Sequence, residues 1–483
     1  MSASFFFYDL ETTGFDPRGA RIMQFAGQRT DLELKPIGEP INELIKITPD
    51  ILPDPGAVLI TGITPQKTLS DGLTEAEFLK KFYKVAVKPD TIFVGFNSVR
   101  FDDEFMRFLN YRNFYDAYEW QWAKGCSRWD ILDVVRAARA LRPDGINWPF
   151  APNGKPTNSL GYLTTLNKLS HESAHDALSD VQATIAVAQL VKSKQPKLFD
   201  HLLSVRKKDK VREIVDSRKP FMYVSGRYPS ENLHTTAAIL LGRHAELDYA
   251  LVYDLRVDPT QFLDMTVDQL IEIWRYNKDP EALRLPVKTL KYNRCPAVIP
   301  GVVQDKETLA RLRLDLKEIT SNATKLSKAG KVFVDKLFEA VDKLDQEREK
   351  AQIALVDNEL TVDGRLYDGF IDNADKQTMR AVRVAEPADL SQFAASLKDA
   401  RLKSLLPLYK ARNFPKSLSS EELEAWEKFR FNRLFEGGTE SRLAKYLGQL
   451  QELSSQKLNG EQQYLLEELK LYAESIIPED VAG

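Results

Sequence analysis

The stretch FFFYDLETTG, residues 5–14, constrains this chain more than any other. Its four consecutive aromatic residues predict a buried β-strand, and the Thr-Thr-Gly that follows predicts a turn. Side chains alternate across a strand, so Asp9 and Glu11 project from the same face near its end. Two carboxylates held together in a buried place repel each other and lose hydration. A divalent cation relieves both costs, and oxygen ligands favour Mg²⁺ or Mn²⁺.

The pattern Asp-x-Glu is not diagnostic by itself. The aromatic run before Asp9 distinguishes this copy, because such a run disfavours a solvated location. Charged helix faces, strand ends or turns explain other copies, among them Asp31/Glu33, Asp279/Glu281, Asp345/Glu347 and Asp357/Glu359.

The composition is that of an ordinary globular protein. The 483 residues are 43% hydrophobic and 28% charged, enough for two to four domains. A net charge of -3 excludes a polycation, so any surface for nucleic acid must be local. Cys126 and Cys295 are too few for a disulfide framework or a cysteine-based zinc site. Without a long apolar run or a signal-peptide pattern, we expect a soluble, cytoplasmic protein with no membrane partner.

The order of the expected elements divides the chain into three parts. Strands come first and then alternate with helices, one of them expected over 127–141, which predicts a mixed sheet covered by helices. Short strands with turn signals over 221–254 predict a small antiparallel barrel or sandwich. Beyond about residue 306 the chain is nearly all helical in pattern. The basic segment 201–220 fits either a solvated helix face or a phosphate-binding role.

Three further residues can join the first acidic pair. Asp102 follows the strand-like segment 91–96, where either a site at a sheet edge or a helix N-terminus favours an acid. Asp180 lies in the second turn of a helix for which Asp176 is the natural N-cap. His175 stands just before that helix, where a histidine usually caps or packs.

Four acids from three segments, together with one histidine, match the needs of a two-metal site. Two ions can stabilise the attacking and leaving oxygens of a phosphoryl displacement. His175 could then take the proton from a metal-bound water. The sequence has no G-x-S-x-G element, P-loop or G-x-G-x-x-G element, which disfavours acyl transfer and nucleotide-dependent chemistry. The residues therefore favour phosphodiester hydrolysis.

The motifs Asp-x-Glu-Thr, Asn-x-x-x-Phe-Asp and His-x-Ala-x-x-Asp resemble the three motifs of the DEDDh family of 3′-to-5′ exonucleases. Longer strings are similar to the bacterial exonuclease I family of single-strand-specific deoxyribonucleases, and they run nearly from end to end. These strings are GITP (62–65), NSVRFDDE (97–104), YRNFYD (111–116), SRWD (127–130), LRPDGINWP (141–149) and YKARNFP (409–415).

The resemblance implies a three-domain architecture. It places an α/β ribonuclease H-like exonuclease domain at 1–195, an SH3-like β-barrel with flanking helices at 196–350, and an all-α C-terminal domain at 351–483. The three would surround a groove for single-stranded DNA. The activity implied is processive removal of 5′-mononucleotides from a 3′ end by a monomer, in DNA repair and recombination.

The resemblance also assigns the metal site and a protein partner. It implies two Mg²⁺ ions, for which Mn²⁺ should substitute, and His175 as general base. The residues matched to metal ligands are Asp9, Glu11, Asp102 and Asp180. The family works beside the single-stranded DNA-binding protein, whose acidic C-terminal tail could meet Arg142, although the match over 300–305 is poor.

Contacts with DNA follow from the same match. Cations would meet phosphates, while Tyr118 and Trp122 could stack on bases, with core packing as the alternative for both rings. Ser159 stands where the family has a basic residue. The last phosphate could therefore be bound more weakly, or be bound by another cation. The matched positions are Glu11, Thr12, Arg107, Tyr118, Trp122, Arg136, Ser159, Lys288 and Asn293.

Two other functions stay open. A DEDDh exonuclease that acts on RNA or proofreads for a polymerase would carry the same motifs, because fine pocket shape senses a 2′-hydroxyl. The long C-terminal extension favours the single-strand deoxyribonuclease. A non-catalytic single-strand-binding scaffold is disfavoured by the intact acids, since unrelieved carboxylates cost stability and serve DNA binding poorly.

Overall fold

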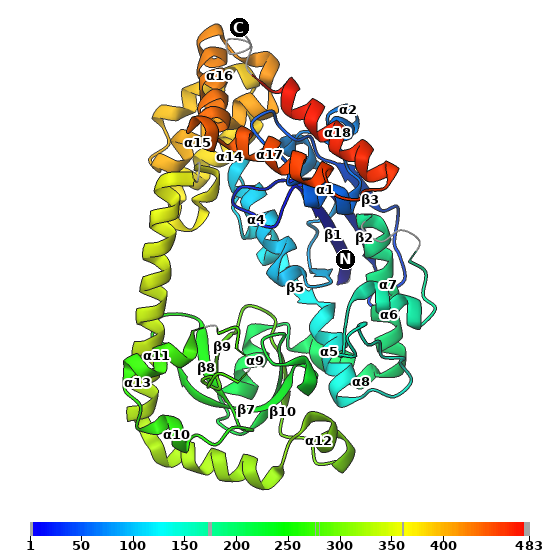
Figure 1. Ribbon diagram of the computed structural model, residues 1–483, viewed down its shortest axis with the longest axis vertical. Helices are drawn as coiled ribbons and strands as arrows, with labels where there is room; N and C mark the ends of the chain where they lie inside the picture. Colours follow the sequence, from blue (N-terminus) through cyan, green and yellow to red (C-terminus); the bar gives the residue numbers. More distant parts are fainter. Residues whose placement is uncertain (1–2, 172–175, 276, 280, 360–361, 478–483) are drawn as a thin grey trace.

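A five-stranded mixed sheet forms the centre of the N-terminal part of the molecule (Figure 1). The computed structural model describes residues 3–171, 176–275, 277–279, 281–359 and 362–477. The strand order is β3-β2-β1-β4-β5; β1 is antiparallel to β2 and parallel to β4. The strands are β1 (Ser4–Thr12), β2 (Ile22–Thr30), β3 (Ile41–Leu44), β4 (Thr91–Gly95) and β5 (Ser127–Asp130). The predicted mixed sheet is thus confirmed.

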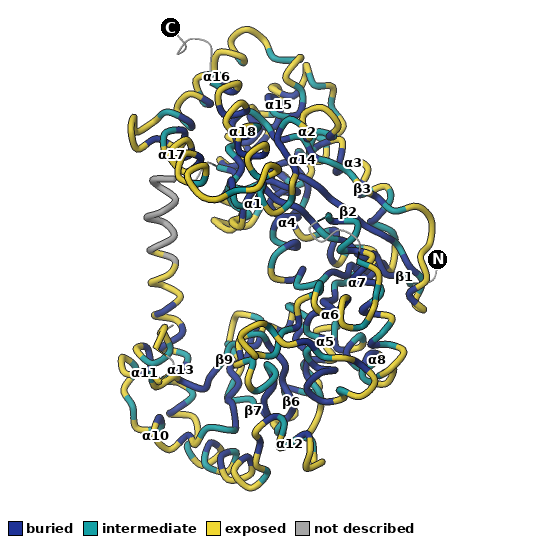
Figure 2. Tube along the Cα trace, turned by 45° about the vertical axis from the view of Figure 1, so that its right-hand side comes forward, coloured by how far each residue is buried: buried dark blue, intermediate teal, exposed yellow. Residues whose placement is uncertain are grey.

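Alternation along β1 explains its aromatic run, because the strand is buried on both faces (Figure 2). Phe5 and Phe7 belong to a core shared with α5 (Ile131–Leu141) and α7 (Ala177–Lys194). Phe6 and Tyr8 belong to a second core, shared with α3 (Glu75–Val85) and α4 (Asp102–Arg112). We call this unit the α/β domain. Its remaining helices are α1 (Pro55–Thr61), α2 (Pro65–Asp71), α6 (Leu160–Leu166), α8 (Pro196–Ser204) and α9 (Lys208–Val215).

One helix of the α/β domain is shorter than expected. The helix predicted over 127–141 begins only at Ile131, because Ser127–Asp130 forms β5 and pairs with β4. Trp129 packs in this strand against Phe5, with ring centroids 6.2 Å apart. The sheet neighbour, which the local pattern does not reveal, decides the conformation of these four residues.

Most helix ends of the α/β domain follow local signals. Thr74 and Glu77 form a capping box at the start of α3. Asp54 caps α1, and Gly62 ends it with a left-handed conformation at φ 67°. The first turn of α4 differs, because the preceding residue, Phe101, offers no side-chain hydrogen bond to it. Something other than an N-cap must hold that turn.

A second five-stranded sheet, entirely antiparallel, follows in the chain with the order β10-β6-β7-β8-β9. We call this sheet and the helices packed on it the barrel. Its core is shared with α11 (Val267–Trp274) and the first half of α13 (Leu316–Glu359). The strands are β6 (Phe221–Val224), β7 (Thr235–Arg243), β8 (Tyr249–Asp254), β9 (Val287–Lys291) and β10 (Ala297–Pro300). The small helices are α10 (Thr260–Leu263) and α12 (Lys306–Leu312).

The long element α13 leads from the barrel to a set of C-terminal helices, which we call the helical domain (Figure 1). Gly330 breaks α13 with φ 66° and ψ -156°, and the rest of the element runs along one side of the molecule. The helical domain packs back on the α/β domain: Val58 of α1 lies in one core with Leu443 and Leu469. No helix among the described residues is long and apolar enough to span a membrane. The domain comprises α14 (Asn373–Val384), α15 (Ala400–Asn413), α16 (Ser420–Phe435), α17 (Arg442–Ser454) and α18 (Gly460–Ser475).

Buried ion pairs join the helical domain to the α/β domain. Arg412 of α15 contacts Asp50 at 2.8 Å and Asp363 at 2.7 Å, and both carboxylates are fully buried. Arg21 of the α/β domain donates to Asp363 Oδ2 at 2.8 Å. Although burial opposes ionisation, Arg412 and then Arg433 lower the pKa of Asp50 to about 2. The acids therefore stay charged and depend on their arginines.

Arg412→Met should weaken this junction strongly, because it removes the arginine that donates hydrogen bonds to both buried carboxylates. We expect the free energy of unfolding to fall by about 3 kcal/mol or more, measured by urea denaturation. Arg365→Ala is the matched control, since it breaks only the exposed Arg365–Asp368 pair; its cost should stay below about 1 kcal/mol. Equal, small losses in the two variants would contradict a structural role for the buried pairs.

Candidate active site

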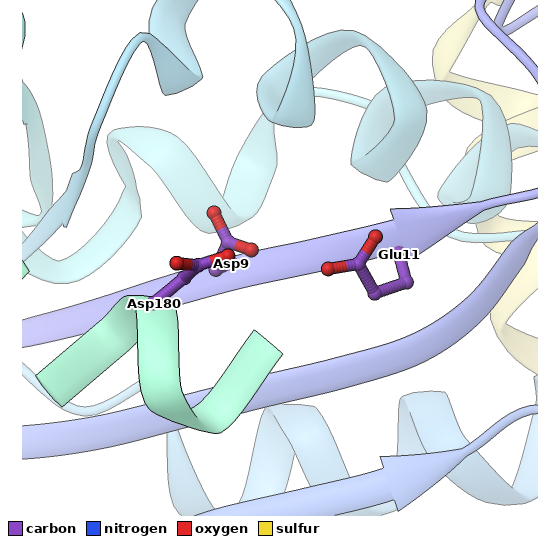
Figure 3. Close-up of side chains that lie close together, drawn as sticks. All are labelled: Asp9, Glu11 and Asp180. Carbon is purple, nitrogen blue, oxygen red and sulfur yellow. The ribbon is translucent and has the colours of Figure 1, made fainter. Parts of the chain in front are cut away.

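Asp9, Glu11 and Asp180 meet near the end of β1 (Figure 3). One carboxylate oxygen from each lies within 4.8 Å of the others. Asp9 and Glu11 are on the face of β1 that packs against α7, and α7 carries Asp180. The structure therefore brings together three of the four predicted acids, at a spacing that a divalent ion can bridge.

The start of α7 is fixed by two interactions that place Asp180. Asp176 caps the helix by accepting a hydrogen bond from Ser179 N at 3.1 Å, as expected. Gln24 of β2 donates to the same carboxylate, at 3.0 Å from Oδ1. Asp180 follows one turn later, so the sheet and the cap together set its position.

Asp102, the fourth predicted acid, opens α4 and lies outside the cluster of three. It is 4% exposed. Burial raises its pKa to about 8, and Asp103 adds to the shift, while backbone N–H groups of Asp102 and Leu10 oppose it. Its charge also raises the pKa values of Asp9 and Glu11, so it acts on the same site.

Ionisation of these acids is costly in the metal-free protein. Burial, followed by repulsion from Asp102, Asp180 and Glu11, raises the pKa of Asp9 well above its usual value. Burial, followed by Asp180 and Asp102, raises the pKa of Glu11 to about 8. A hard divalent cation would offset both the burial and the mutual repulsion. The residues present thus fit Mg²⁺ or Mn²⁺.

The predicted general base, His175, lies outside the described residues. A second histidine, His171, contacts the site directly: its Nε2 lies 2.6 Å from Asp180 Oδ1, and its Nδ1 lies 3.1 Å from Thr164 Oγ1. With the proton on Nε2, His171 donates to Asp180 and accepts from Thr164. Such outer hydrogen bonds orient metal-binding carboxylates. Sequence reasoning missed His171, whose only local signal is its position four residues before His175.

Two predicted base-stacking residues have exposed side chains. Trp122 is 65% exposed and Tyr118 is 39% exposed, which disfavours core packing for both. Arg107 is buried, and its guanidinium lies over the Tyr118 ring at 5.4 Å from the centroid. It also donates to Gln121 Oε1 at 3.1 Å. The structure thus places the Arg107 guanidinium against one face of the Tyr118 ring.

The other predicted DNA-binding residues of the α/β domain differ in exposure. Thr12 is buried and donates to Gly14 O at 2.8 Å, which shapes the turn after β1. Arg136 pairs with Asp133 at 2.7 Å. Ser159 is exposed at the start of α6.

Two predicted DNA-binding residues lie on the barrel. Lys288 is half-buried on β9, where burial lowers its pKa; within the described part of the chain no ion pair engages it. Asn293 is exposed, and its backbone oxygen accepts a hydrogen bond from Arg128 at 2.8 Å. The contacts of all these residues with DNA stay a prediction.

Comparison with known proteins decides the family. Three family models match successive parts of the chain: Exonuclease at residues 6–188, Exonuclease I SH3-like domain at 206–342 and Exonuclease I C-terminal domain at 360–476. The chain is 39% identical over 488 residues to Exodeoxyribonuclease I of Escherichia coli, with 99% of each chain covered. The chain belongs to the bacterial exonuclease I family.

Solved structures of the exonuclease I family share the whole architecture. Exonuclease I from Methylocaldum szegediense is 39% identical, with a TM-score of 0.90 over 99% of this chain and 100% of that one. Escherichia coli exonuclease I in complex with a dA16 oligonucleotide is 37% identical, with a TM-score of 0.89 over 98% and 100%. These matches confirm the predicted exonuclease domain, SH3-like barrel and helical domain. They identify a nuclease, and its exonuclease domain implies dependence on a divalent metal.

Metal affinity should rise with pH, because Glu11 and Asp102, each with a pKa of about 8, must lose protons to become ligands. We expect the apparent affinity for Mn²⁺, measured by calorimetry, to increase about tenfold or more from pH 6 to pH 8 and then level off. A pH-independent affinity over this range would contradict the raised pKa values.

The stability of the metal-free protein should change in the opposite sense. The raised pKa values of Glu11 and Asp102 mean that the native state binds more protons than the unfolded chain. The stabilisation is complete below the unfolded-state values near 4 and is lost as pH rises towards about 8. The midpoint of thermal unfolding without metal should fall over this range, and saturating Mn²⁺ should restore more of it at pH 8 than at pH 6.

His171→Ala should weaken Mn²⁺ binding about tenfold, because Asp180 loses the hydrogen bond that orients it. His171→Gln is the matched variant, since its amide can donate from nearly the same place, and it should recover most of the affinity. Calorimetry gives the affinity, and the midpoint of thermal unfolding checks for general damage. Equal loss in both variants, or loss in neither, would contradict the orienting role.

Proposed function

We propose that this chain is a processive, metal-dependent 3′-to-5′ exodeoxyribonuclease that releases 5′-mononucleotides from single-stranded DNA. The observation that carries the proposal is the convergence of Asp9, Glu11 and Asp180, with Asp102 acting on them, at the end of a strand buried on both faces. The family match over 99% of the chain supports it. The binding of a dA16 oligonucleotide by a relative supports the substrate class.

The four acids would hold two Mg²⁺ ions, for which Mn²⁺ should substitute. The bound metal supplies a more acidic water and charge stabilisation at the attacking and leaving oxygens. Asp9, Glu11 and Asp180 are close enough to bind the same metal ion, and Asp102 at the start of α4 would be the fourth ligand. His175 would accept the proton of the attacking water. A zinc-bound complex of Escherichia coli exonuclease I with single-stranded DNA, 36% identical to this chain, supports a metal site in this family.

The exposed aromatic rings would bind the strand without reading its sequence. Every base has a face that can stack on Tyr118 or Trp122, so the chain can advance one nucleotide at a time. Arg107, lying over the Tyr118 ring, would keep that platform in place. Lys288 and Asn293 would contact the strand on the barrel. Ser159 can donate a hydrogen bond to the terminal nucleotide but brings no charge.

We propose a single-stranded DNA-binding protein as partner of a monomeric, cytoplasmic enzyme in DNA repair and recombination. Arg142 is exposed at the end of α5, where it could receive an acidic tail. A solved structure of an SSB/exonuclease I complex, 36% identical and covering 99% of this chain, supports the partnership.

A single assay tests substrate, polarity and metal together. Single-stranded DNA, duplex DNA and RNA, each labelled at the 5′ end, are offered with Mg²⁺ or with chelator. We expect shortened products from single-stranded DNA only, and only with metal. Equal shortening of RNA would favour the RNA-directed alternative, and products in chelator would contradict the metal mechanism.

Asp180→Asn provides the matched test of the site in the same assay. It should lower the rate of cleavage by about three orders of magnitude or more, because it removes a metal ligand. Single-strand binding should stay measurable, because the base-stacking surface is unchanged. Asp335→Asn, an exposed acid on α13, should leave both unchanged. Equal loss of cleavage and binding in Asp180→Asn would mean that Asp180 is structural.

A further inference from the structure

Three consecutive acids open α4, and the two that follow Asp102 have no role in the motifs described above. Asp103 is 1% exposed and accepts two hydrogen bonds. Tyr8, which neighbours Asp9 on β1, donates to Oδ1 of Asp103 at 2.5 Å. Arg128 of β5 donates to Oδ2 of the same carboxylate. Asp103 therefore ties α4 to β1, which carries Asp9 and Glu11, and to the edge strand β5.

Arg128 extends this connection into the barrel. Its other terminal nitrogen, Nη2, donates to the backbone oxygen of Asn293 at 2.8 Å, in the loop between β9 and β10. The guanidinium is nearly buried, with 10% of the side chain exposed. One cation thus joins a barrel loop to the carboxylate adjacent to Asp102, with a charge-assisted hydrogen bond to each.

Glu104 meets both of the other domains. Its Oε1 accepts from Arg294 of the barrel at 2.9 Å and from Arg107 at 2.5 Å. Its Oε2 accepts from the hydroxyl of Tyr367, a residue of the helical domain. The Tyr367 ring also packs edge-on against Phe108 of α4, with centroids 5.6 Å apart. The carboxylate of Glu104 is therefore a point where all three domains touch.

Arg294 also holds the segment that leads into α4. It donates from Nη1 to Val99 O at 3.1 Å, in the turn before the helix. This support matters because Phe101 gives α4 no side-chain cap. In most helices an N-cap fixes the first turn locally. Here side chains from other strands and other domains fix it.

We propose that Asp103 and Glu104 are positioning residues. Through them, the position of Asp102 depends on the contacts that the α/β domain makes with the barrel and the helical domain. The proposal rests on the proposed function, because it takes Asp102 as a metal ligand. Arg128 and Arg294 also offset the charges of the two acids next to Asp102, so that three adjacent carboxylates can occupy one helical turn. The barrel and the helical domain thereby contribute to the metal site as well as to DNA binding.

The first turn of α4 is also connected to Tyr118, one of the two proposed base-stacking residues. Arg107, bonded to Glu104, lies over the ring of Tyr118. A change in the domain contacts at Glu104 should therefore shift Asp102 at the proposed metal site. It should also shift Arg107 and, with it, the ring of Tyr118. Contacts that served only to bind DNA would alter KM alone. Contacts that position Asp102 should also alter kcat and metal affinity.

The test uses the full chain with Arg294→Gln, Tyr367→Phe and the double variant. Tyr367→Phe removes one hydroxyl and keeps the ring against Phe108, so it should not unfold the protein. We expect the double variant to weaken Mn²⁺ binding without DNA, and to lower kcat on single-stranded DNA, by about tenfold each, with smaller effects in the single variants. Arg275→Gln is the matched control, because Arg275 forms an exposed pair with Glu347 of α13, away from α4; it should change neither quantity.

Two results would overturn the proposal. The first is a double variant whose Mn²⁺ affinity and kcat match the wild type while KM rises, which would restrict these contacts to DNA binding. The second is a Tyr367→Phe variant that equals the wild type while Arg294→Gln accounts for the whole effect, which would remove the helical domain from the coupling. Asp102→Asn separates this from a failure of the proposed function: if it binds Mn²⁺ as tightly as the wild type, Asp102 is not a ligand and the metal assignment itself fails.

Discussion

Repulsion among carboxylates at the end of a buried strand is the constraint on which the rest of this structure depends. β1 brings Asp9 and Glu11 into a place where burial alone raises their pKa values. Asp180 and Asp102 then add charge of the same sign. Their mutual repulsion is unfavourable in the metal-free fold, and this cost is consistent with a site that is completed by divalent cations. The strand can impose this cost because both of its faces are packed with aromatic side chains.

Other buried acids are stabilised by cations, both within the domains and between them. Arg412 and Arg21 neutralise Asp50 and Asp363 where the helical domain meets the α/β domain. Arg128 and Arg294 do the same for the acids of α4, where the barrel approaches. In each case an acid that would be unfavourable alone is stabilised by a cation from a distant segment. The contacts that hold the three domains together and the proposed metal site thus both depend on pairing buried acids with cations.

Much of the fold and the acidic cluster could be predicted because the relevant patterns are local. Alternation along β1 gives the shared face of Asp9 and Glu11, and Asp176 marks the start of the helix that carries Asp180. Residues 127–130 were expected to be helical, and only their pairing with β4 makes them a strand. Local pattern shows which face is buried, but it does not show which neighbour covers it.

The missed functional residues share one property: their partners are distant in the sequence or leave no periodic signal. His171 reaches Asp180 from a segment without helical or strand pattern. Tyr367 meets Glu104 across 263 positions, and Arg412 meets Asp50 across 362. Charge patterns identify such residues as polar, yet they contain no information on which carboxylate each will meet. The three-dimensional fold supplies that pairing.

The most direct test of the central claim is anomalous diffraction from crystals of the wild-type protein grown with Mn²⁺ at pH 8. The account predicts two manganese peaks about 3.5–4 Å apart, bound by oxygens of Asp9, Glu11, Asp102 and Asp180. Well-ordered carboxylates with no peak between them, or manganese bound only elsewhere on the molecule, would contradict it.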